Sequence, residues 1–175
     1  MASAQSIRSA IRDIPNFPQP GIVFRDITPV LADPGLFKDS ITLLCDTAGG
    51  TAIDKIVGID ARGFIFAAAV ADRLGAGFVP VRKKGKLPWN TRGLSYTLEY
   101  GEAEVEIHED AVNPGEKVLL VDDLLATGGT ASAAVQLLDG LGADLVAVSF
   151  LIELNGLSGR DKLGDHRIES IVQYE

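Results

Sequence analysis

The sequence contains one cysteine, two histidines and no long apolar run, and each scarcity removes a class of function. The lone Cys45 cannot form a disulfide within the chain, which favours a reducing compartment. It lies in an apolar-periodic segment, so we expect a buried core thiol rather than a reactive one. His108 and His166 lack the spacing of a structural zinc site. No segment approaches the roughly 18 apolar residues of a membrane-spanning helix.

Basic residues are also scarce relative to acidic ones. Lysine and arginine number 16 against 24 aspartates and glutamates, which gives a formal net charge of -8. This balance argues against sequence-independent binding of nucleic acid, which requires a basic face. Residues 1–14 lack the apolar core of a signal peptide. We therefore expect a cytoplasmic protein that binds neither nucleic acid nor membrane.

Apolar segments of strand and helix length alternate along the chain. At 175 residues, the chain suits a single domain, 1–175. Short apolar runs without polar alternation are typical of parallel strands that are covered on both faces. We expect such strands at residues 55–59, 78–82, 117–121 and 145–152, and helices at residues 34–48, 62–74 and 130–141. The sequence thus predicts an α/β fold with a central, mainly parallel sheet flanked by helices.

One segment breaks this rhythm in the middle of the chain. Apolar and polar residues alternate at 94–100 and again at 104–107, on either side of Gly101. This pattern predicts an antiparallel hairpin inserted into the parallel fold. Residues 83–108 are rich in glycine and charge, so we expect them to form a mobile lid.

The N-terminal region has a pattern of its own. Apolar residues recur at helical spacing between Ile7 and Ile14, which predicts a short amphipathic helix. Three prolines follow between residues 15 and 20 and force an extended path. We expect residues 15–30 to form a small N-terminal flap.

Two acidic residues follow the expected strand at 117–121. Ligands of open α/β sheets bind beyond the carboxyl ends of the strands, where Asp122 and Asp123 lie. Small residues then stand directly before a helix, where backbone N–H groups and the helix dipole favour an anion. They are Ala126, Thr127, Gly128, Gly129 and Thr130. Together, these features predict a site for a sugar that carries both phosphate and hydroxyl groups.

A second anion site is expected where the strand at 55–59 ends. The N-terminus of the next helix suits an anionic group there, and Arg62 either adds positive charge or merely covers the helix end. The connecting residues are Asp60, Ala61, Arg62 and Gly63. Phe64 occupies the position at which a nucleoside-triphosphate loop requires lysine, so that motif is excluded.

Four cations lie within the five residues from Arg82 to Lys86. A charge run of this kind is often a solvated surface. In an acidic protein, at the same edge of the sheet as the two expected anion sites, attraction of pyrophosphate is the better interpretation. Arg82 and Lys86 are the candidates.

Residues 118–130 resemble the phosphoribosyl-pyrophosphate signature of the type I phosphoribosyltransferases, which consists of an apolar strand, two acids, a Thr-Gly loop and a helix. Further segments are similar, in the same order, to blocks of the adenine phosphoribosyltransferase family. They are residues 20–29, 60–64, 82–88 and 98–101. With the segment Gln173-Tyr174-Glu175, the resemblance covers nearly the whole chain.

The resemblance implies that the phosphoribosyl group of 5-phosphoribosyl 1-pyrophosphate (PRPP) is transferred to adenine, which gives AMP and pyrophosphate. It assigns Asp122 and Asp123 to the ribose hydroxyls, residues 126–130 to the 5′-phosphate, and residues 60–63 to the pyrophosphate. It also implies Mg²⁺, held mainly by substrate oxygens and water, and a homodimer.

In the flap, the resemblance implies that Phe24 stacks on the purine while the backbone of Val23 and Arg25 contacts its edge. Phe24 as an ordinary core residue is the alternative. In the lid, Glu99 and Tyr100 match the Glu-Tyr pair of the family's mobile loop. Glu99 would accept the purine proton or stabilise the cationic sugar, and with Tyr100 and Arg62 it forms the implied catalytic set.

Two other functions remain open at this point. The same reaction could use a 6-oxopurine, namely guanine, hypoxanthine or xanthine. The same sugar-phosphate module also occurs in PRPP-sensing regulators of transcription. A regulator would need a DNA-binding segment or a basic face, and the sequence has neither.

Overall fold

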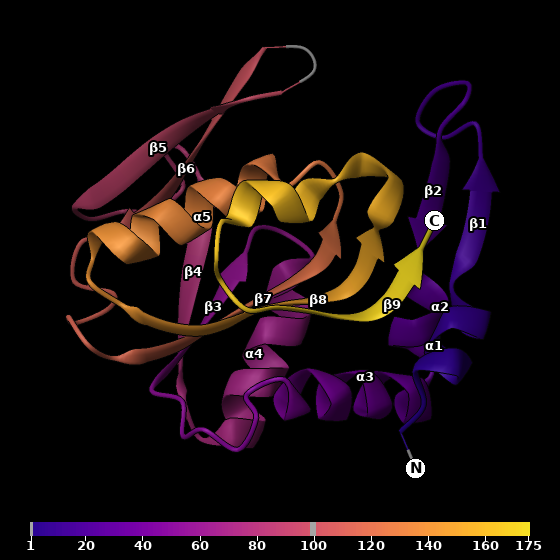
Figure 1. Cartoon of the computed structure of the whole chain (residues 1–175), viewed down its shortest axis with the longest axis horizontal. Helices are drawn as coiled ribbons and strands as arrows, with labels where there is room; N and C mark the ends of the chain where they lie inside the picture. The colour runs from indigo at the N-terminus through magenta and orange to yellow at the C-terminus, as the bar shows by residue number, and fades with distance from the viewer. Residues whose placement is uncertain (1, 99–100) are drawn as a thin grey trace.

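The computed structural model describes residues 2–98 and 101–175 and is built around one seven-stranded sheet (Figure 1). The strand order is β5-β6-β4-β3-β7-β8-β9. Strands β4, β3, β7, β8 and β9 are mutually parallel, whereas β6 pairs antiparallel with both β4 and β5. The bounds are Lys55–Ile59 for β3, Gly77–Lys83 for β4, Thr91–Thr97 for β5, Glu102–His108 for β6, Lys117–Leu125 for β7, Asp144–Leu154 for β8 and Ile168–Tyr174 for β9. The predicted mainly parallel sheet is confirmed.

Helices cover both faces of this sheet. Helices α1 to α4 lie on one face, and α5 lies on the other with two short 3₁₀ helices, η1 and η2 (Figure 1). Their bounds are Ala4–Ala10 for α1, Thr28–Ala32 for α2, Pro34–Asp46 for α3, Gly63–Leu74 for α4, Gly129–Gly140 for α5, Asn155–Leu157 for η1 and Gly159–Leu163 for η2. Among the described residues, no helix combines the length and the apolar character that crossing a membrane requires.

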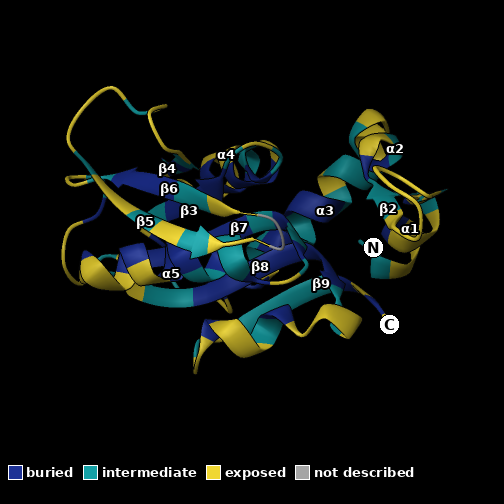
Figure 2. Ribbon diagram, turned by 90° about the horizontal axis from the view of Figure 1, so that it is seen from above, coloured by how far each residue is buried: buried dark blue, intermediate teal, exposed yellow. Residues whose placement is uncertain are grey.

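The sheet separates two hydrophobic cores. Alternate residues of β7 point to opposite faces, so Leu119 packs with α3 and α4 while Leu120 packs with α5, and both are fully buried. Figure 2 shows the central strands as the buried layer of the molecule. This burial on both faces explains why the strands are apolar without alternation. Cys45 lies partly buried against the first core, and burial raises the pKa of its thiol.

Local chemistry determines the start of α3 and the end of α4. Asp33 caps α3, because its carboxylate accepts the N–H groups of Gly35 and Leu36 at 2.9 and 2.8 Å, and Pro34 occupies the first helical position. Helix α4 ends at Gly75 in the left-handed conformation, with φ of 67°.

Two strands differ from the expectation. Strand β7 does not end at residue 121 but continues to Leu125, because Asp122 and Leu124 pair with Phe150 and Ile152 of β8. The acids therefore lie within the strand. Strand β9 was not predicted, because polar residues interrupt it and it has one neighbour, β8. An edge strand needs no continuous apolar run.

The N-terminal prediction was wrong in one respect. Helix α1 ends at Ala10, and Ile14 lies instead in strand β1, Arg12–Pro15. This strand pairs antiparallel with β2, Val23–Asp26, in a separate two-stranded sheet. The pairing removes Ile14 from the helix even though its spacing suits one. We call the β1–β2 hairpin the flap.

The central hairpin was predicted correctly as antiparallel, with β5 and β6 on either side of residues 98–101. It is not a separate insertion, however. Strand β6 joins the main sheet through pairing of Arg82 with Glu106 and Lys83 with Val105. The hairpin therefore extends one edge of the sheet.

Candidate active site

The helices that follow β3 and β7 lie on opposite faces of the sheet. These neighbouring parallel strands, paired for example at Gly58 and Val121, lead to helices on opposite faces, β3 to α4 and β7 to α5. A crevice forms beyond the strand ends at such a point, and ligands bind there. The protein has a cavity of about 270 Å³ at this place, lined by residues 59–62 and 122–131.

Two helix N-termini open into this cavity without a side-chain cap. Helix α5 is preceded by Gly128, which has φ of 78° and no side chain, and α4 is preceded by Arg62, whose side chain does not cap the helix. Ser3 and Asp33, in contrast, cap α1 and α3 with their side chains. Helix α2 also lacks a side-chain cap but does not line this cavity. Neither α4 nor α5 has an acidic residue in its first turn, a feature that the other α-helices share. The free N–H groups and dipoles of α4 and α5 suit anionic groups of a ligand.

Asp122 lies in β7 beside the start of α4. Its Oδ1 accepts the N–H of Asp123 at 2.9 Å. A Cβ at position 63 would lie 2.5 Å from the same Oδ1, so Gly63 allows the start of α4 to reach the carboxylate. Burial and the neighbouring charge of Asp123 raise the pKa of Asp122 well above its usual range. Hydroxyl donors from a ligand would stabilise the charged form.

Asp123 pairs with Arg62, the residue that precedes α4. The distance from Asp123 Oδ2 to Arg62 Nε is 2.8 Å, and Asp123 is only 6% exposed. Burial raises the pKa of Asp123, an effect that the Arg62 charge opposes. Arg62 also lies 5.4 Å from the ring centroid of Phe24, and it thereby joins the cavity to the flap.

Asp60 holds Arg82, the first of the four basic residues between positions 82 and 86. Its carboxylate accepts the Nε–H of Arg82 at 3.1 Å, and Arg82 Nη1 donates to the carbonyl oxygen of Lys86 at 3.3 Å. The Lys86 side chain remains exposed, and the peptide between Asp60 and Ala61 is cis. Arg82 thus lies next to the cavity through Asp60 without lining it.

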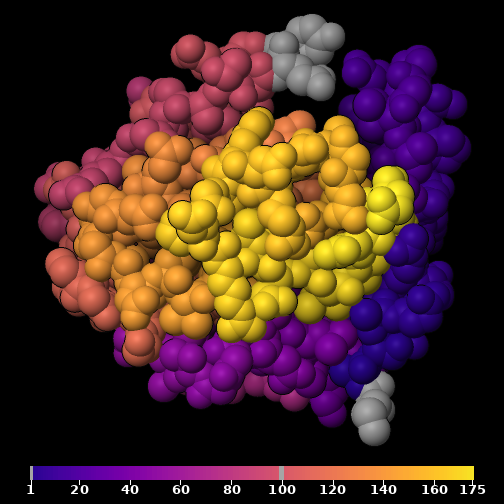
Figure 3. Space-filling view, in the orientation of Figure 1, coloured from indigo at the N-terminus to yellow at the C-terminus, as the bar shows by residue number. Residues whose placement is uncertain are grey.

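The flap presents an aromatic and apolar surface beside Arg62. Phe24 packs edge-to-face on Phe17 with 5.2 Å between ring centroids, and Val23 is 45% exposed. The Arg25 side chain turns away, because it pairs with Asp13 and its guanidinium lies 3.9 Å from the ring centroid of Tyr174. Figure 3 shows the flap and the β5–β6 hairpin standing apart on the same side of the molecule.

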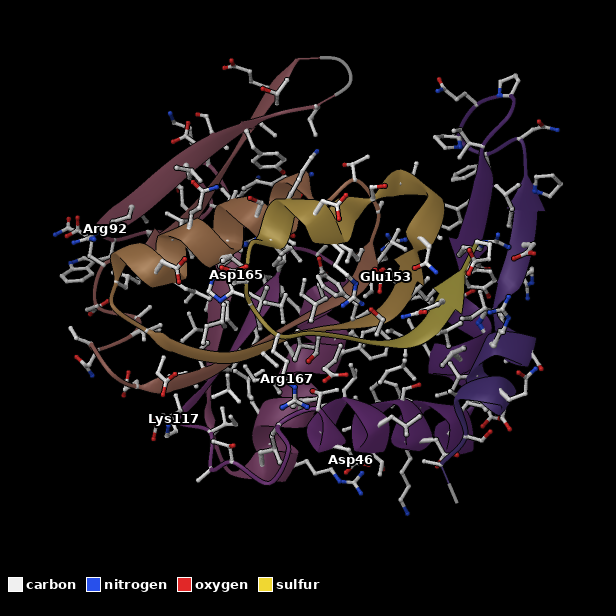
Figure 4. The ribbon with its side chains drawn as sticks, in the orientation of Figure 1. Asp46, Arg92, Lys117, Glu153, Asp165 and Arg167 are labelled. Atoms are coloured by element: carbon white, nitrogen blue, oxygen red, sulfur yellow. The ribbon has the colours of Figure 1, made fainter. Side chains whose placement is uncertain are left out.

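The β5–β6 hairpin lies along α5. The Thr130 hydroxyl donates to the Tyr96 hydroxyl at 2.9 Å, and Arg92 donates to the carbonyl of Gly140 at 2.8 Å at the other end of the helix (Figure 4). Sequence reasoning missed Tyr96, although a hydroxyl on the apolar side of an alternating strand is a signal for it. Glu99 and Tyr100 lie outside the described residues.

The structure brings most predicted site residues together. Those that line the cavity are Asp60, Ala61, Arg62, Asp122, Asp123, Ala126, Thr127, Gly128, Gly129 and Thr130. Gly63 and Arg82 contact it through Asp122 and Asp60, and Phe24 through Arg62. The Lys86 side chain does not line the cavity, although its carbonyl oxygen accepts a hydrogen bond from Arg82, and Val23 and Arg25 belong to the flap. Within residues 2–98 and 101–175, no group of three His, Cys, Asp or Glu side chains could hold a metal ion.

Comparison with known proteins agrees with this geometry. A model of the phosphoribosyl transferase domain matches residues 30–173. The adenine phosphoribosyltransferase of Acidothermus cellulolyticus is 56% identical over 168 residues, which cover 95% of this chain and 94% of that protein. The crystal structure of the enzyme from Thermoanaerobacter pseudethanolicus superposes with a TM-score of 0.94, at 49% identity, and covers 98% of this chain and 100% of that one.

A third relative was solved with ligands. The adenine phosphoribosyltransferase of Saccharomyces cerevisiae, complexed with an imino-altritol bisphosphate and adenine, has a TM-score of 0.91 and 42% identity over 96% of this chain and 97% of that one. Identity at this level over nearly the whole length, together with the domain match, shows the family. This chain belongs to the adenine phosphoribosyltransferases.

Proposed function

We propose that this protein transfers the phosphoribosyl group of PRPP to adenine, releasing AMP and pyrophosphate. The observation that carries the proposal is the convergence of two uncapped helix N-termini and two carboxylates on one cavity where β3 and β7 diverge. That combination suits a ligand with an anion at each end and hydroxyls between them. Membership of the family supports adenine as the acceptor.

Each part of the cavity lining suits a different chemical group of PRPP. Residues 126–130, at the N-terminus of α5, bind the 5′-phosphate, and Asp122 and Asp123 accept hydrogen bonds from the ribose hydroxyls. The loop 60–63 and Arg62 bind the pyrophosphate, with Arg82 adding positive charge behind it. The solvent-exposed side chain of Lys86 adds positive charge near this loop and attracts the anionic substrate.

The flap receives the base. Phe24 is partly exposed beside Arg62, so a flat purine can stack on it at the mouth of the cavity. The backbone of Val23 and Arg25 offers a donor and an acceptor to the edge of the ring. Adenine carries an amino group and ring nitrogens that match such a pair.

In the reaction, the purine N9 forms a bond to C1 of the ribose as the bond to pyrophosphate breaks. Positive charge develops on the sugar, and the N9 proton must leave. Glu99 is proposed to accept that proton or stabilise the cationic sugar, Tyr100 belongs to the same proposed catalytic set, and closure of the hairpin would exclude water. Arg62 stabilises the negative charge of the departing pyrophosphate.

Mg²⁺ fits this site as an ion held mainly by substrate oxygens and water. The carboxylates that line the cavity are those of Asp60, Asp122 and Asp123, of which Asp60 pairs with Arg82 and Asp123 with Arg62. Hard oxygen ligands of this kind suit Mg²⁺, which usually retains several waters. When bound, the ion neutralises charge on the pyrophosphate. We also propose a homodimer, as the resemblance to the family implies.

The acceptor base is tested directly. Purified protein is incubated with PRPP and Mg²⁺ and with adenine, guanine, hypoxanthine or xanthine, and nucleotide formation is followed by chromatography. We expect kcat/KM for adenine to exceed that for each 6-oxopurine by about 100-fold or more, because a site built to pair with the amino group leaves polar groups unpaired against an oxo group. Preferred turnover of guanine or xanthine would overturn adenine as the substrate.

Replacement of Glu99 tests its assignment. The Glu99→Ala variant should lower kcat by about 100-fold while changing both KM values less than threefold, because the carboxylate acts on charge and a proton that appear only in the transition state. Glu102→Ala, which changes a carboxylate at the start of β6, is the control. Equal kcat values for Glu99→Ala and the wild type would exclude a catalytic role.

A further inference from the structure

The loop proposed for the 5′-phosphate is in backbone contact with a segment far along the chain. A Cβ at Gly128 would lie 2.3 Å from the carbonyl oxygen of Gly159, and a Cβ at Gly159 would lie 2.2 Å from the carbonyl oxygen of Ala126. Neither position accepts a larger residue without displacement of backbone. The position of the loop therefore depends on the position of Gly159, the first residue of η2.

The residue after Gly159 is held by a bidentate ion pair. Arg160 Nε lies 2.9 Å from Glu153 Oε1, and Arg160 Nη2 lies 2.6 Å from Glu153 Oε2. A third donor, Arg160 Nη1, reaches the carbonyl of Ile168 at 3.0 Å. A planar guanidinium that uses three donors fixes its own backbone more tightly than a single contact does.

Glu153 is well placed to serve as the fixed half of this pair (Figure 4). It lies near the carboxyl end of β8, is 4% exposed, and stands opposite Leu125, the residue before the loop. The hydroxyl of Ser170 also donates to it. The hydrogen bonds from Arg160 lower the pKa of Glu153, which keeps the carboxylate charged. Strands β7, β8 and β9 thus provide a rigid support for the ion pair.

We propose that Glu153 and Arg160 are positioning residues for the 5′-phosphate loop, acting through contact of Gly159 with Ala126 and Gly128. The proposal rests on the proposed function in assigning this loop to the phosphate of PRPP. Neither side chain lines the cavity. Their effect is to set the direction of the loop N–H groups, on which phosphate binding depends.

Three variants test the proposal, and two of them have a matched control. Arg160→Lys keeps the charge but removes the fork, and its control is Arg167→Lys, whose arginine pairs with Glu169 at 2.8 Å on the same segment. Glu153→Gln keeps the shape but removes the charge. Gly159→Ala adds the colliding Cβ, and its control is Gly156→Ala, where a Cβ would have no neighbour closer than 4.0 Å.

The measurements are the KM for PRPP, the KM for adenine, the Kd of PRPP with Mg²⁺ by calorimetry, and the unfolding midpoint. We expect the three variants to raise the KM and the Kd of PRPP by roughly tenfold or more, because small displacements of a binding group are costly. The KM for adenine should change less than twofold, and both controls should resemble the wild type.

Parallel changes of both KM values, or a lower unfolding midpoint with an unchanged Kd of PRPP, would show a merely structural role and overturn the proposal. If Arg160→Lys does not fold, Glu153→Gln decides, since it places a neutral amide in nearly the same volume as the carboxylate. Failure of the proposed function is separate: a wild-type protein that binds PRPP but does not convert adenine refutes the substrate and leaves the Kd comparison valid.

Discussion

A double variant, Asp122→Asn with Asp123→Asn, is expected to fold normally and to lose between 100- and 10,000-fold in kcat/KM for PRPP. Each carboxylate is proposed to accept hydrogen bonds from ribose hydroxyls, and a hydrogen bond to a charged group contributes about 1.5–3 kcal/mol. Two such losses give about 3–6 kcal/mol, with each 1.4 kcal/mol a factor of about ten.

The variant should still fold, because burial makes the charged form of both carboxylates energetically unfavourable. Burial raises the pKa of each, so a neutral amide of the same shape removes an electrostatic cost. Arg62, the partner of Asp123, is 41% exposed at its side chain and can be solvated when the pair is lost. The unfolding midpoint and circular dichroism check this half of the prediction.

A control double variant distinguishes the effect of losing these two carboxylates from the effect of changing the net charge of the protein. Asp139 and Asp144 pair with His166 and Lys117 away from the cavity, so Asp139→Asn with Asp144→Asn changes the net charge equally. That variant should retain wild-type kinetics. Full activity of the Asp122 and Asp123 variant would refute the assignment of these carboxylates to the ribose.

The second large effect is expected from Gly128→Ala. Gly128 has φ of 78°, and a Cβ there would lie 2.3 Å from the Gly159 carbonyl oxygen. The left-handed conformation alone costs a residue with a side chain about 1–2 kcal/mol, and relief of the collision must displace backbone. We expect a loss of about 2–4 kcal/mol in the free energy of unfolding and about 100-fold in kcat/KM for PRPP, because the N–H groups at the start of α5 move with the loop.

Gly115→Ala separates the cost of the left-handed backbone from the cost of the collision with Gly159. Gly115 has φ of 82°, but a Cβ there would meet nothing within 4 Å. This variant should therefore show the backbone cost of about 1–2 kcal/mol and unchanged kinetics. Urea unfolding and steady-state assays of both variants make the comparison, and equal behaviour of the two would mean that the contact with Gly159 is of no consequence.

The sequence predicted best those features that local chemistry determines. The strand Lys55–Ile59 was predicted with its observed bounds, because an apolar run bounded by polar residues leaves little choice. Strand β7 was expected to end at residue 121, since aspartate disfavours strands. Pairing of Asp122 with β8 overrides that preference. Strand β9 and the pairing of Ile14 in the flap depend on distant partners, which no local pattern reveals.

In the candidate site, too, local motifs were predictable and contacts between distant segments were not. Residues 122–130 form one contiguous motif, so their common location in the cavity was predictable. The pairing of Arg62 with Asp123 joins two separate motifs, and only the adjacency of β3 and β7 creates it. Gly159 lies outside every motif that was recognised, and its contact with Gly128 needs the packing of η2 on the loop. Long-range contacts between backbones leave almost no trace in composition.

The stacking of Tyr174 on Arg8 and Arg25 has a consequence for the order in which the enzyme is assembled during its synthesis. The two guanidinium groups lie 4.4 and 3.9 Å from the tyrosine ring centroid, so a strand made late holds a hairpin made early. A ribosome adds about 5–20 residues per second, so the flap waits about 7–30 seconds after the synthesis of Arg25 until Tyr174 is added. The surface proposed for the base is completed after the cavity walls at residues 59–62 and 122–131 have emerged.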